Sequence, residues 1–309
     1  MLSSKGQDFH PALCEGGITM TGVKEAQTTK RSDYAVGVIF LIVSALAFSS
    51  TGVFSKGVEA TAWEVIFWRA VFASLSTTAF VASRSALRSE FLEMGRAGLV
   101  VGVIGAAGTA ALIPAFKLTD IANVALIYAA APFIAALLAW RVIGEKVSKR
   151  TALGAAAALA GVLIIVAGSI GSVHLLGDGL ALIMTTVMAS IMVLYRANPH
   201  TPSSGPSVLQ SLFLIPLALL FGHPLQTAPI EIAILAAFGV FHAIASVTLA
   251  EGAKRVPAGQ TALLGALETP LAPILAFLIL AEIPAFATIF GGAIVLIAVL
   301  ASLKPTESG

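Results

Sequence analysis

The sequence predicts an all-α integral membrane protein of ten transmembrane helices, arranged as two inverted five-helix repeats. Three observations predict this fold. Of the 309 residues, 58% are hydrophobic and only 11% are charged, against about 25% charged residues in an ordinary soluble domain. The apolar residues also gather into ten segments of about 20 residues, the length that crosses a bilayer. Finally, a stretch of the first half returns in the second half at a fixed spacing, which indicates an internal duplication.

The ten segments follow a polar N-terminal tail. Residues 1–32 are polar and mixed in charge, so we expect a disordered cytoplasmic tail, with translation starting at Met1 or Met20. The first repeat, 33–170, and the second repeat, 171–303, then hold five segments each, and residues 304–309 form a second cytoplasmic tail. Each segment has about 17–22 residues, enough for about 30 Å of hydrocarbon at a rise of 1.5 Å per residue. We place the segments at 35–54, 63–83, 97–116, 121–140, 151–169, 177–195, 206–222, 232–252, 259–280 and 285–303.

The duplication is clearest between Lys117 and Leu163, where 14 of 47 residues are identical to those found 137 positions later. The matches include polar residues, because Lys117 corresponds to Lys254 and Glu145 to Glu282. Each half holds an odd number of helices, so equivalent helices must cross the membrane in opposite directions. Lys117 is therefore expected outside and Lys254 inside. Inverted repeats of this kind are a recurring plan of secondary transporters.

Basic residues predict the orientation, because cytoplasmic loops carry an excess of Lys and Arg. With the N-terminus inside, only Lys56 and Lys117 fall outside, and Arg69 lies within a span. Both termini are therefore expected in the cytoplasm. The remaining basic residues all fall on the cytoplasmic side: Lys5, Lys24, Lys30, Arg31, Arg84, Arg88, Arg96, Arg141, Lys146, Lys149, Arg150, Arg196, Lys254, Arg255 and Lys304.

Two short patterns resemble a known family: FWRA at 67–70, and a proline followed thirteen residues later by a glutamate, from Pro132 to Glu145. With the ten spans and the doubled unit, the chain resembles the EamA-type branch of the drug/metabolite transporter superfamily over residues 35–303. The resemblance implies that the first four helices of each half surround a central cavity, with the fifth peripheral. It also implies a bacterial inner-membrane protein that moves amino acids, related metabolites or drugs, often outward. The second half departs from the pattern, since Thr269 takes the place of Pro132 and Pro270 follows it.

Arg69 is the first candidate substrate-binding residue. It lies about six residues, or about 9 Å, inside its predicted span, where an arginine is costly unless it is paired or faces water. We expect it to bind an anionic substrate group or a carboxylate. The alternatives are a structural ion pair, or a side chain that reaches the outer headgroups past Glu64.

Glu268 is the second candidate and lies near the middle of its predicted span. Its counterpart in the first half is Ala131, so the shared architecture does not require a carboxylate there. It would either carry a coupled proton or pair with a cationic substrate amine. The alternative is a neutral acid that donates one hydrogen bond to a neighbouring helix. His242, also near mid-span, would join the site if it faced Glu268, and is otherwise a packed core residue.

Four further residues complete the predicted substrate-binding set. Trp68 and Tyr128 would line the cavity, or else pack against lipid and neighbouring helices. Asn123 and Gln260 correspond to each other between the two halves and lie near the starts of their spans. Either capping of a helix or hydrogen bonding to a substrate would explain these two amides.

Prolines mark candidate hinges. Pro132, Pro270 and Pro273 fall on equivalent helices of the two halves, and each removes a backbone donor and favours a kink. This predicts paired hinges or gates, although a static kink would leave the same trace in the sequence. Among the acids near span ends, Glu251 precedes Lys254 by three residues, the spacing of a helical salt bridge.

The sequence lacks the residues that the competing function classes would need. An intramembrane enzyme would need a motif such as H-E-x-x-H, a serine with a partner histidine, or a second aspartate beside Asp178, and a channel would need polar or charged rings. No basic patch with interleaved aromatic residues suggests nucleic acid. We therefore predict a secondary transporter rather than an enzyme, working in a lipid bilayer by alternating access, without a cofactor, and coupled to protons if Glu268 carries one. Neither the substrate nor the oligomeric state is predicted.

Overall fold

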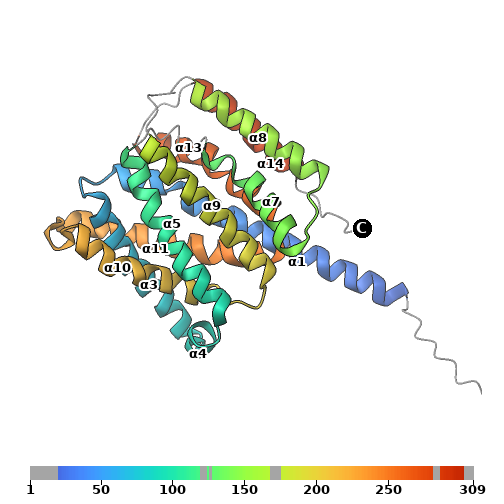
Figure 1. Cartoon of the computed structure of the whole chain (residues 1–309), viewed down its shortest axis with the longest axis horizontal. Helices are drawn as coiled ribbons and strands as arrows, with labels where there is room; N and C mark the ends of the chain where they lie inside the picture. The colour runs from blue at the N-terminus through green and yellow to red at the C-terminus, as the bar shows by residue number, and fades with distance from the viewer. Residues whose placement is uncertain (1–19, 119–123, 125–126, 168–174, 281–285, 303–309) are drawn as a thin grey trace, which may run out of the picture.

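The computed structural model of the chain is a bundle of helices packed side by side (Figure 1). It describes residues 20–118, 124, 127–167, 175–280 and 286–302, and within these ranges every regular element is a helix. The main elements are α1 (Met20–Ser49), α2 (Thr51–Lys56), α3 (Ala62–Ser83), α4 (Leu87–Phe91), α5 (Gly95–Leu118), α7 (Ala131–Ile143), α8 (Lys149–Ala167), α9 (Leu175–Ala197), α10 (Ser204–Phe221), η1 (Pro224–Gln226), α11 (Pro229–Arg255), α12 (Ala258–Gly265), α13 (Glu268–Leu280) and α14 (Phe286–Ser302).

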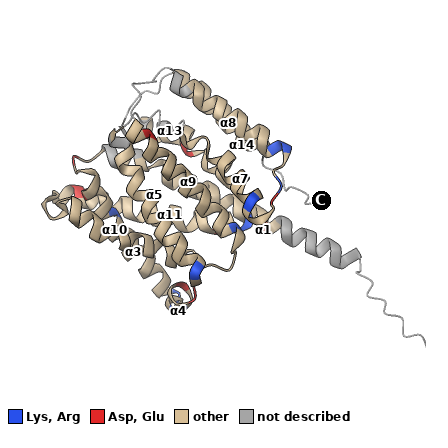
Figure 2. Cartoon of the chain, in the orientation of Figure 1, with Lys and Arg blue, Asp and Glu red and all other residues tan. Residues whose placement is uncertain are grey.

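Seven stretches of helix in the described residues are long and apolar enough to cross a membrane. Two shorter apolar helices, Ala131–Ile143 and Ile289–Ala301, accompany them. Charged residues lie largely at helix ends, and the helix interiors are mostly uncharged (Figure 2). The predicted all-helical, multi-pass class is therefore confirmed for these residues, whereas length and composition alone do not reach the predicted ten crossings. The seven stretches are Ser32–Ser49, Ala62–Ser83, Gly95–Ala115, Leu175–Ala197, Ser204–Phe221, Pro229–Arg255 and Ala258–Ile279.

The N-terminal region differs in part from the expected tail. Helix α1 begins at Met20, so residues 20–32, which we expected to be disordered, continue it as helix. This stretch contains no proline, and extending an existing helix adds one hydrogen bond for each residue ordered. Residues 1–19 and 303–309, the rest of the two predicted tails, lie outside the described residues.

Helices α1 and α11 pack antiparallel. Near one end, Asp33 Oδ1 lies 3.3 Å from Arg255 Nε; further along, Ser44 Oγ donates a hydrogen bond of 2.9 Å to the carbonyl oxygen of Ala245. The two helices approach closely at Gly252, where an added Cβ would lie only 2.4 Å from the Leu41 side chain. Small residues that permit such approach are the usual means of helix association in a membrane.

Helices α5 and α9 repeat this relation. Val101 and Tyr195 share one buried cluster, whereas Ala115 and Ala181 share another, so residue numbers rise along α5 as they fall along α9. The first helix of each half therefore packs antiparallel against the third helix of the other half.

The other helices also make matching contacts between the two halves. The second helices of the two halves, α3 and α10, pack on each other, with the rings of Trp63 and Phe221 5.1 Å apart at one end. Each of them also packs on the third helix of the other half, α3 on α11 and α10 on α5. The fifth helices, α8 and α14, pair side by side at one edge of the bundle (Figure 1). The two halves thus contribute equivalent elements to equivalent contacts.

Candidate functional site

The fourth helix of each half is interrupted. In the second half, α12 ends at Gly265, a turn follows at residues 266–267, and α13 begins at Glu268. In the first half, a turn at residues 129–130 directly precedes α7. The duplication spacing of 137 residues superimposes the two turns. Broken helices at matched positions are a common source of binding sites in inverted-repeat transporters, because they bring free helix ends into the membrane.

The candidate hinge prolines follow these breaks. Pro132 is in the first turn of α7, and Pro270 is the third residue of α13. Backbone N–H groups in the first turn of a helix have no partner within the helix, so a proline there removes no hydrogen bond. Each of the two prolines thus lies at a helix start directly after a turn, where the chain is able to bend, and their role as hinges stays a prediction. Pro273 lies further along α13, and its side chain is outside the described residues.

Arg69 is buried within the bundle. Its side chain on α3 is only 2% exposed, and its Nε has no hydrogen-bond partner in the described part of the chain. Its guanidinium lies over the Phe238 ring, with Cζ 5.5 Å from the centroid. The Arg69 side chain does not extend past Glu64 toward the outer headgroups, since it is buried. Glu64 Oε2 instead accepts a 2.8 Å hydrogen bond from the backbone N–H of Thr61 and caps α3. A buried cation without a hydrogen bond at Nε is costly, so Arg69 has capacity for an anionic partner.

His242 lies on α11, which packs against α3, the helix of Arg69. The His242 side chain is 8% exposed, and a Cβ on Gly239, one turn earlier on α11, would lie 3.0 Å from the carbonyl oxygen of Arg69. The His242 ring meets the ring of Phe48 edge to face, with centroids 5.8 Å apart. A role for His242 in the site stays a prediction.

Glu268 and Tyr128 form a second polar centre. Glu268 is the first residue of α13 and is half-buried, and Tyr128 lies near it. The Tyr128 hydroxyl oxygen lies 3.4 Å from where a Cβ on Gly265 would be, so the tyrosine reaches the break between α12 and α13. A carboxylate in the first turn also suits the positive end of the helix dipole, which is a structural reason for an acid at this position.

Phe48 connects the two centres. It contacts His242 and also packs against the main buried cluster, which includes Leu264 and Leu267 beside the break. Among the described residues, Arg69 and Glu268 form no ion pair with each other. The sequence did not single out Phe48 or Phe238, because a phenylalanine in an apolar helix carries no signal that separates packing from function.

The remaining predicted residues have other partners. Trp68 Nε1 donates a 2.9 Å hydrogen bond to the carbonyl oxygen of Pro224, so its polar atom is occupied by the loop before α11. Gln260 is 2% exposed, and its Oε1 accepts a 3.0 Å hydrogen bond from the Tyr34 hydroxyl, which joins α12 to α1. Asn123 lies outside the described residues. Among the described residues, no group of acidic, histidine or cysteine side chains is suited to a metal ion.

A depression of about 740 Å³ opens between the N-terminal ends of α3 and α11. Three carboxylates line it, those of Glu59, Glu64 and Glu231. Arg69 lies five residues further along α3 than Glu64, or about 7.5 Å at the helical rise. Arg69 itself does not line the depression.

Comparison with known proteins agrees with this architecture. The EamA-like transporter family matches the chain twice, over residues 35–167 and again over residues 170–303. The chain belongs to this family. The two matches cover the two repeats inferred from the sequence, so that duplication is also the family's own unit. No curated protein matches this EamA protein.

Solved structures share the fold of the EamA protein. Among 28 matching chains, one described as "Crystal structure of protein" covers 87% of this chain and 96% of its own length, with a TM-score of 0.74. The two sequences are 18% identical, so this likeness extends to the fold alone.

Proposed function

We propose that this EamA protein is a secondary transporter that moves a small metabolite by alternating access around a cavity between its two repeats. The antiparallel packing of α1 on α11 and of α5 on α9 carries the proposal. First and third helices of a five-helix unit cross a membrane in the same direction, so such pairs would be parallel if the two repeats had the same orientation. Antiparallel packing supports inverted repeats, whose exchange of conformations opens the cavity to one side and then to the other.

Ten crossings follow if α7, α8 and α14 are counted with the longer helices and α12–α13 is counted as one broken span. Both termini then lie on the same side, which the positive-inside rule makes cytoplasmic. We place the protein in the bacterial inner membrane and propose net movement outward, as the family resemblance implies.

Arg69 and Glu268 are the proposed polar anchors. Arg69 would bind an anionic group of the solute, since its Nε lacks a partner. Glu268 would carry a coupled proton or bind a solute amine at the start of α13, with Tyr128 beside it and His242 beside Arg69. Two anchors of opposite charge suit an amino acid or a related metabolite. Gln260 and Trp68 would support the walls, because their polar atoms already bond within the protein.

Topology can be tested without a known solute. In a Cys14→Ser background, cysteines placed at 117 and at 254 should be labelled by an impermeant thiol reagent from opposite sides of the membrane. Labelling of both positions from one side would contradict the inverted repeats, and the rocking mechanism with them.

Transport can be tested by comparing metabolites inside and outside cells that overexpress the protein. We expect one solute class to accumulate outside, and not in cells that express Glu268→Gln at the same level. Reconstituted into proteoliposomes, the wild-type protein should then move that solute in response to an imposed pH gradient if Glu268 carries the coupled proton. No difference in any metabolite between expressing and control cells would contradict export.

A further inference from the structure

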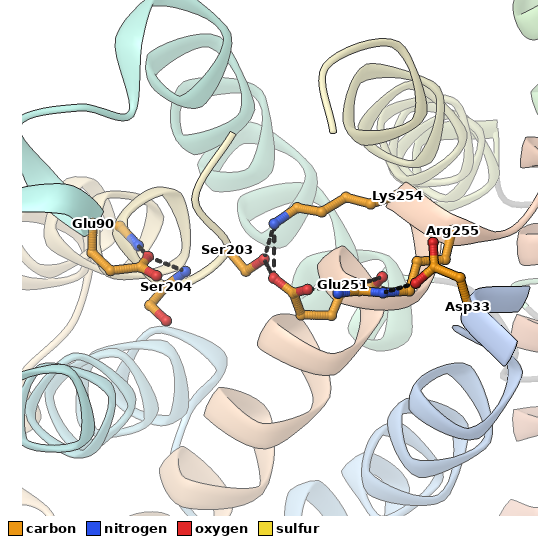
Figure 3. A network of polar contacts seen from close by, with 8 residues as sticks. Asp33, Glu90, Ser203, Ser204, Glu251, Lys254 and Arg255 are labelled. Carbon is orange, nitrogen blue, oxygen red and sulfur yellow. Dashed lines mark hydrogen bonds and ion pairs between the residues drawn. The ribbon is translucent and has the colours of Figure 1, made fainter. Parts of the chain in front are cut away.

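One end of the bundle carries a dense set of polar contacts around the C-terminal end of α11 (Figure 3). Glu251 is at its centre. Its carboxylate is 2.7 Å from Lys254 Nζ, accepts a hydrogen bond from the Ser203 hydroxyl, and pairs with Arg255. The salt bridge between Glu251 and Lys254 is the one that their spacing predicted. All of these residues belong to the second repeat, so they make its end rigid.

Carboxylates of the first repeat attach to this rigid end. Asp33 on α1 pairs with Arg255. Glu90 on α4 accepts hydrogen bonds of 2.9 and 3.2 Å from the backbone N–H groups of Ser204 and Gly205, which are the first residues of α10. N–H groups in the first turn of a helix lack partners within it and favour a negative charge, so Glu90 caps a helix of the other repeat.

Glu145 makes the same kind of contact at two points. Its Oε2 lies 3.0 Å from Arg196 Nε near the end of α9, and its Oε1 accepts a 3.0 Å hydrogen bond from the N–H of Ala258, the first residue of α12. Arg196 in turn donates a 3.2 Å hydrogen bond to the carbonyl oxygen of Lys254. A single side chain in the α7–α8 turn therefore holds two helices of the second repeat. One of them, α12, carries Gln260 and leads to the break at Glu268.

At the opposite end of the bundle, polar contacts between the repeats include the hydrogen bond from the Glu59 N–H to Glu231 Oε1, at 2.6 Å, and the bond from Trp68 to Pro224. The depression of about 740 Å³ opens at that end.

We infer that Glu145, assisted by Glu90 and Asp33, is the latch that holds the predicted cytoplasmic end of the bundle closed. The inference rests on the alternating access proposed above. In that cycle the repeats must separate at one end while they meet at the other, and contacts between repeats that occur at one end must break when it opens. Glu145 is a positioning residue for α12 and does not itself contact the solute.

Glu145 is the strongest of the three carboxylates for physical reasons. The Asp33 side chain is 66% exposed, so water screens its pair with Arg255. Glu145 and Arg196 are only 21% and 31% exposed, and the carboxylate uses both of its oxygens. Removing its charge should therefore free the start of α12 and loosen this end.

The experiment uses a cysteine beneath the latch. Val193 is 3% exposed and packs with Ala139 and Ala258 in one buried cluster, so Val193→Cys in the Cys14→Ser background reports opening at this end. With an impermeant thiol reagent on the predicted cytoplasmic side, Glu145→Gln should raise the labelling rate about tenfold. The charge exchange E145R/R196E restores the ion pair but not the hydrogen bond to the Ala258 N–H, so it should lower the rate only part of the way back toward that of the parent.

Glu64→Gln is the matched control. Glu64 also caps a helix, but its bond to Thr61 lies within one repeat, so its loss should leave the labelling rate at 193 unchanged. An unchanged rate in Glu145→Gln, or an equal rise in Glu64→Gln, would overturn the latch. If Glu145→Gln does not fold, Arg196→Gln removes the partner of the same ion pair from the other side; a raised labelling rate in that variant supports the latch, and an unchanged rate overturns it.

Labelling also separates the latch from the proposed function, because it needs no solute. If labelling responds as expected but no solute moves, the transport proposal falls while the latch stands as a contact that closes this end. If transport occurs and labelling does not respond, the latch alone falls.

Discussion

The two broken helices of the EamA protein share a design and differ at one residue. Both are interrupted at the same position of the repeat, and in both a proline follows in the first turn. The first residue after the break is Ala131 in one half, 1% exposed within the main buried cluster, and Glu268 in the other, half-buried beside Tyr128. The comparison teaches that the architecture needs the break and does not need the carboxylate. The first half is thus an internal control for the second.

The largest loss of stability is expected when a carboxylate is placed at the matching position of the first half, Ala131. Ala131→Glu places an acid among packed alanines with no partner, and an unpaired buried charge costs about 3–5 kcal/mol. The variant should lose most of its folded protein, as measured by thermal unfolding in detergent and by size-exclusion chromatography. The reciprocal Glu268→Ala should remain folded. Equal stability of both variants would mean that the two breaks have equivalent surroundings, and the comparison would fail.

A large loss of transport without loss of fold is expected when the carboxylate is neutralised in place. Glu268→Gln keeps the size of the side chain, so its unfolding temperature should stay near that of the wild type. Transport of the identified solute should fall at least about tenfold, which corresponds to about 1.4 kcal/mol. Measured rates in proteoliposomes that match the wild type would leave Glu268 with its structural role at the helix terminus.

Arg69 extends the comparison to the second helices, since α10, the counterpart of α3, contains no basic residue. Replacing a buried charge by an apolar residue of similar volume is often neutral, or stabilising by about 1–4 kcal/mol. Arg69→Met should therefore unfold at the same temperature as the wild type or higher, while transport falls. Strong destabilisation would instead assign Arg69 to the structure of the bundle.

The smallest effect is expected at the prolines. Pro132→Ala and Pro270→Ala lie in first turns, where proline removes no hydrogen bond, so each should change the free energy of unfolding by less than about 1 kcal/mol. Transport rates measured at several temperatures would show a hinge role as a change in rate without a change in stability. A substitution at one proline only that abolished transport would show that the two breaks move differently.

Features that depend on composition or on spacing along the chain were predictable from the sequence, whereas features that depend on contacts between distant helices were not. The all-helical multi-pass class, the duplication and the Glu251–Lys254 pair depend on composition or on spacing along the chain, and the structure and the family match agree with them. Of the ten predicted spans, seven meet the length and composition of a crossing in the described residues. The breaks were missed, because a turn of two residues between apolar helices leaves little trace in an Ala-rich sequence. The proline pattern was noticed, but propensity alone does not distinguish a kink from a helix start.

The candidate site was only partly predictable. Arg69 and Glu268 stood out because charges are costly in a membrane wherever they lie. Their aromatic neighbours did not, since Phe48 meets His242 and Phe238 meets Arg69 only through packing between helices.

The amino-acid sequence by itself determined the class of this protein, because hydrophobic length and the positions of charges depend on each residue's own transfer energy between water and lipid. It also determined the repeat, because a duplication is visible as identical residues at one fixed spacing in the sequence. Only the tertiary structure decided which charges have partners. Glu145 reaches Arg196 and the start of α12, while Arg69 Nε has no hydrogen-bond partner among the described residues, and both facts arise from contacts between helices far apart in the chain.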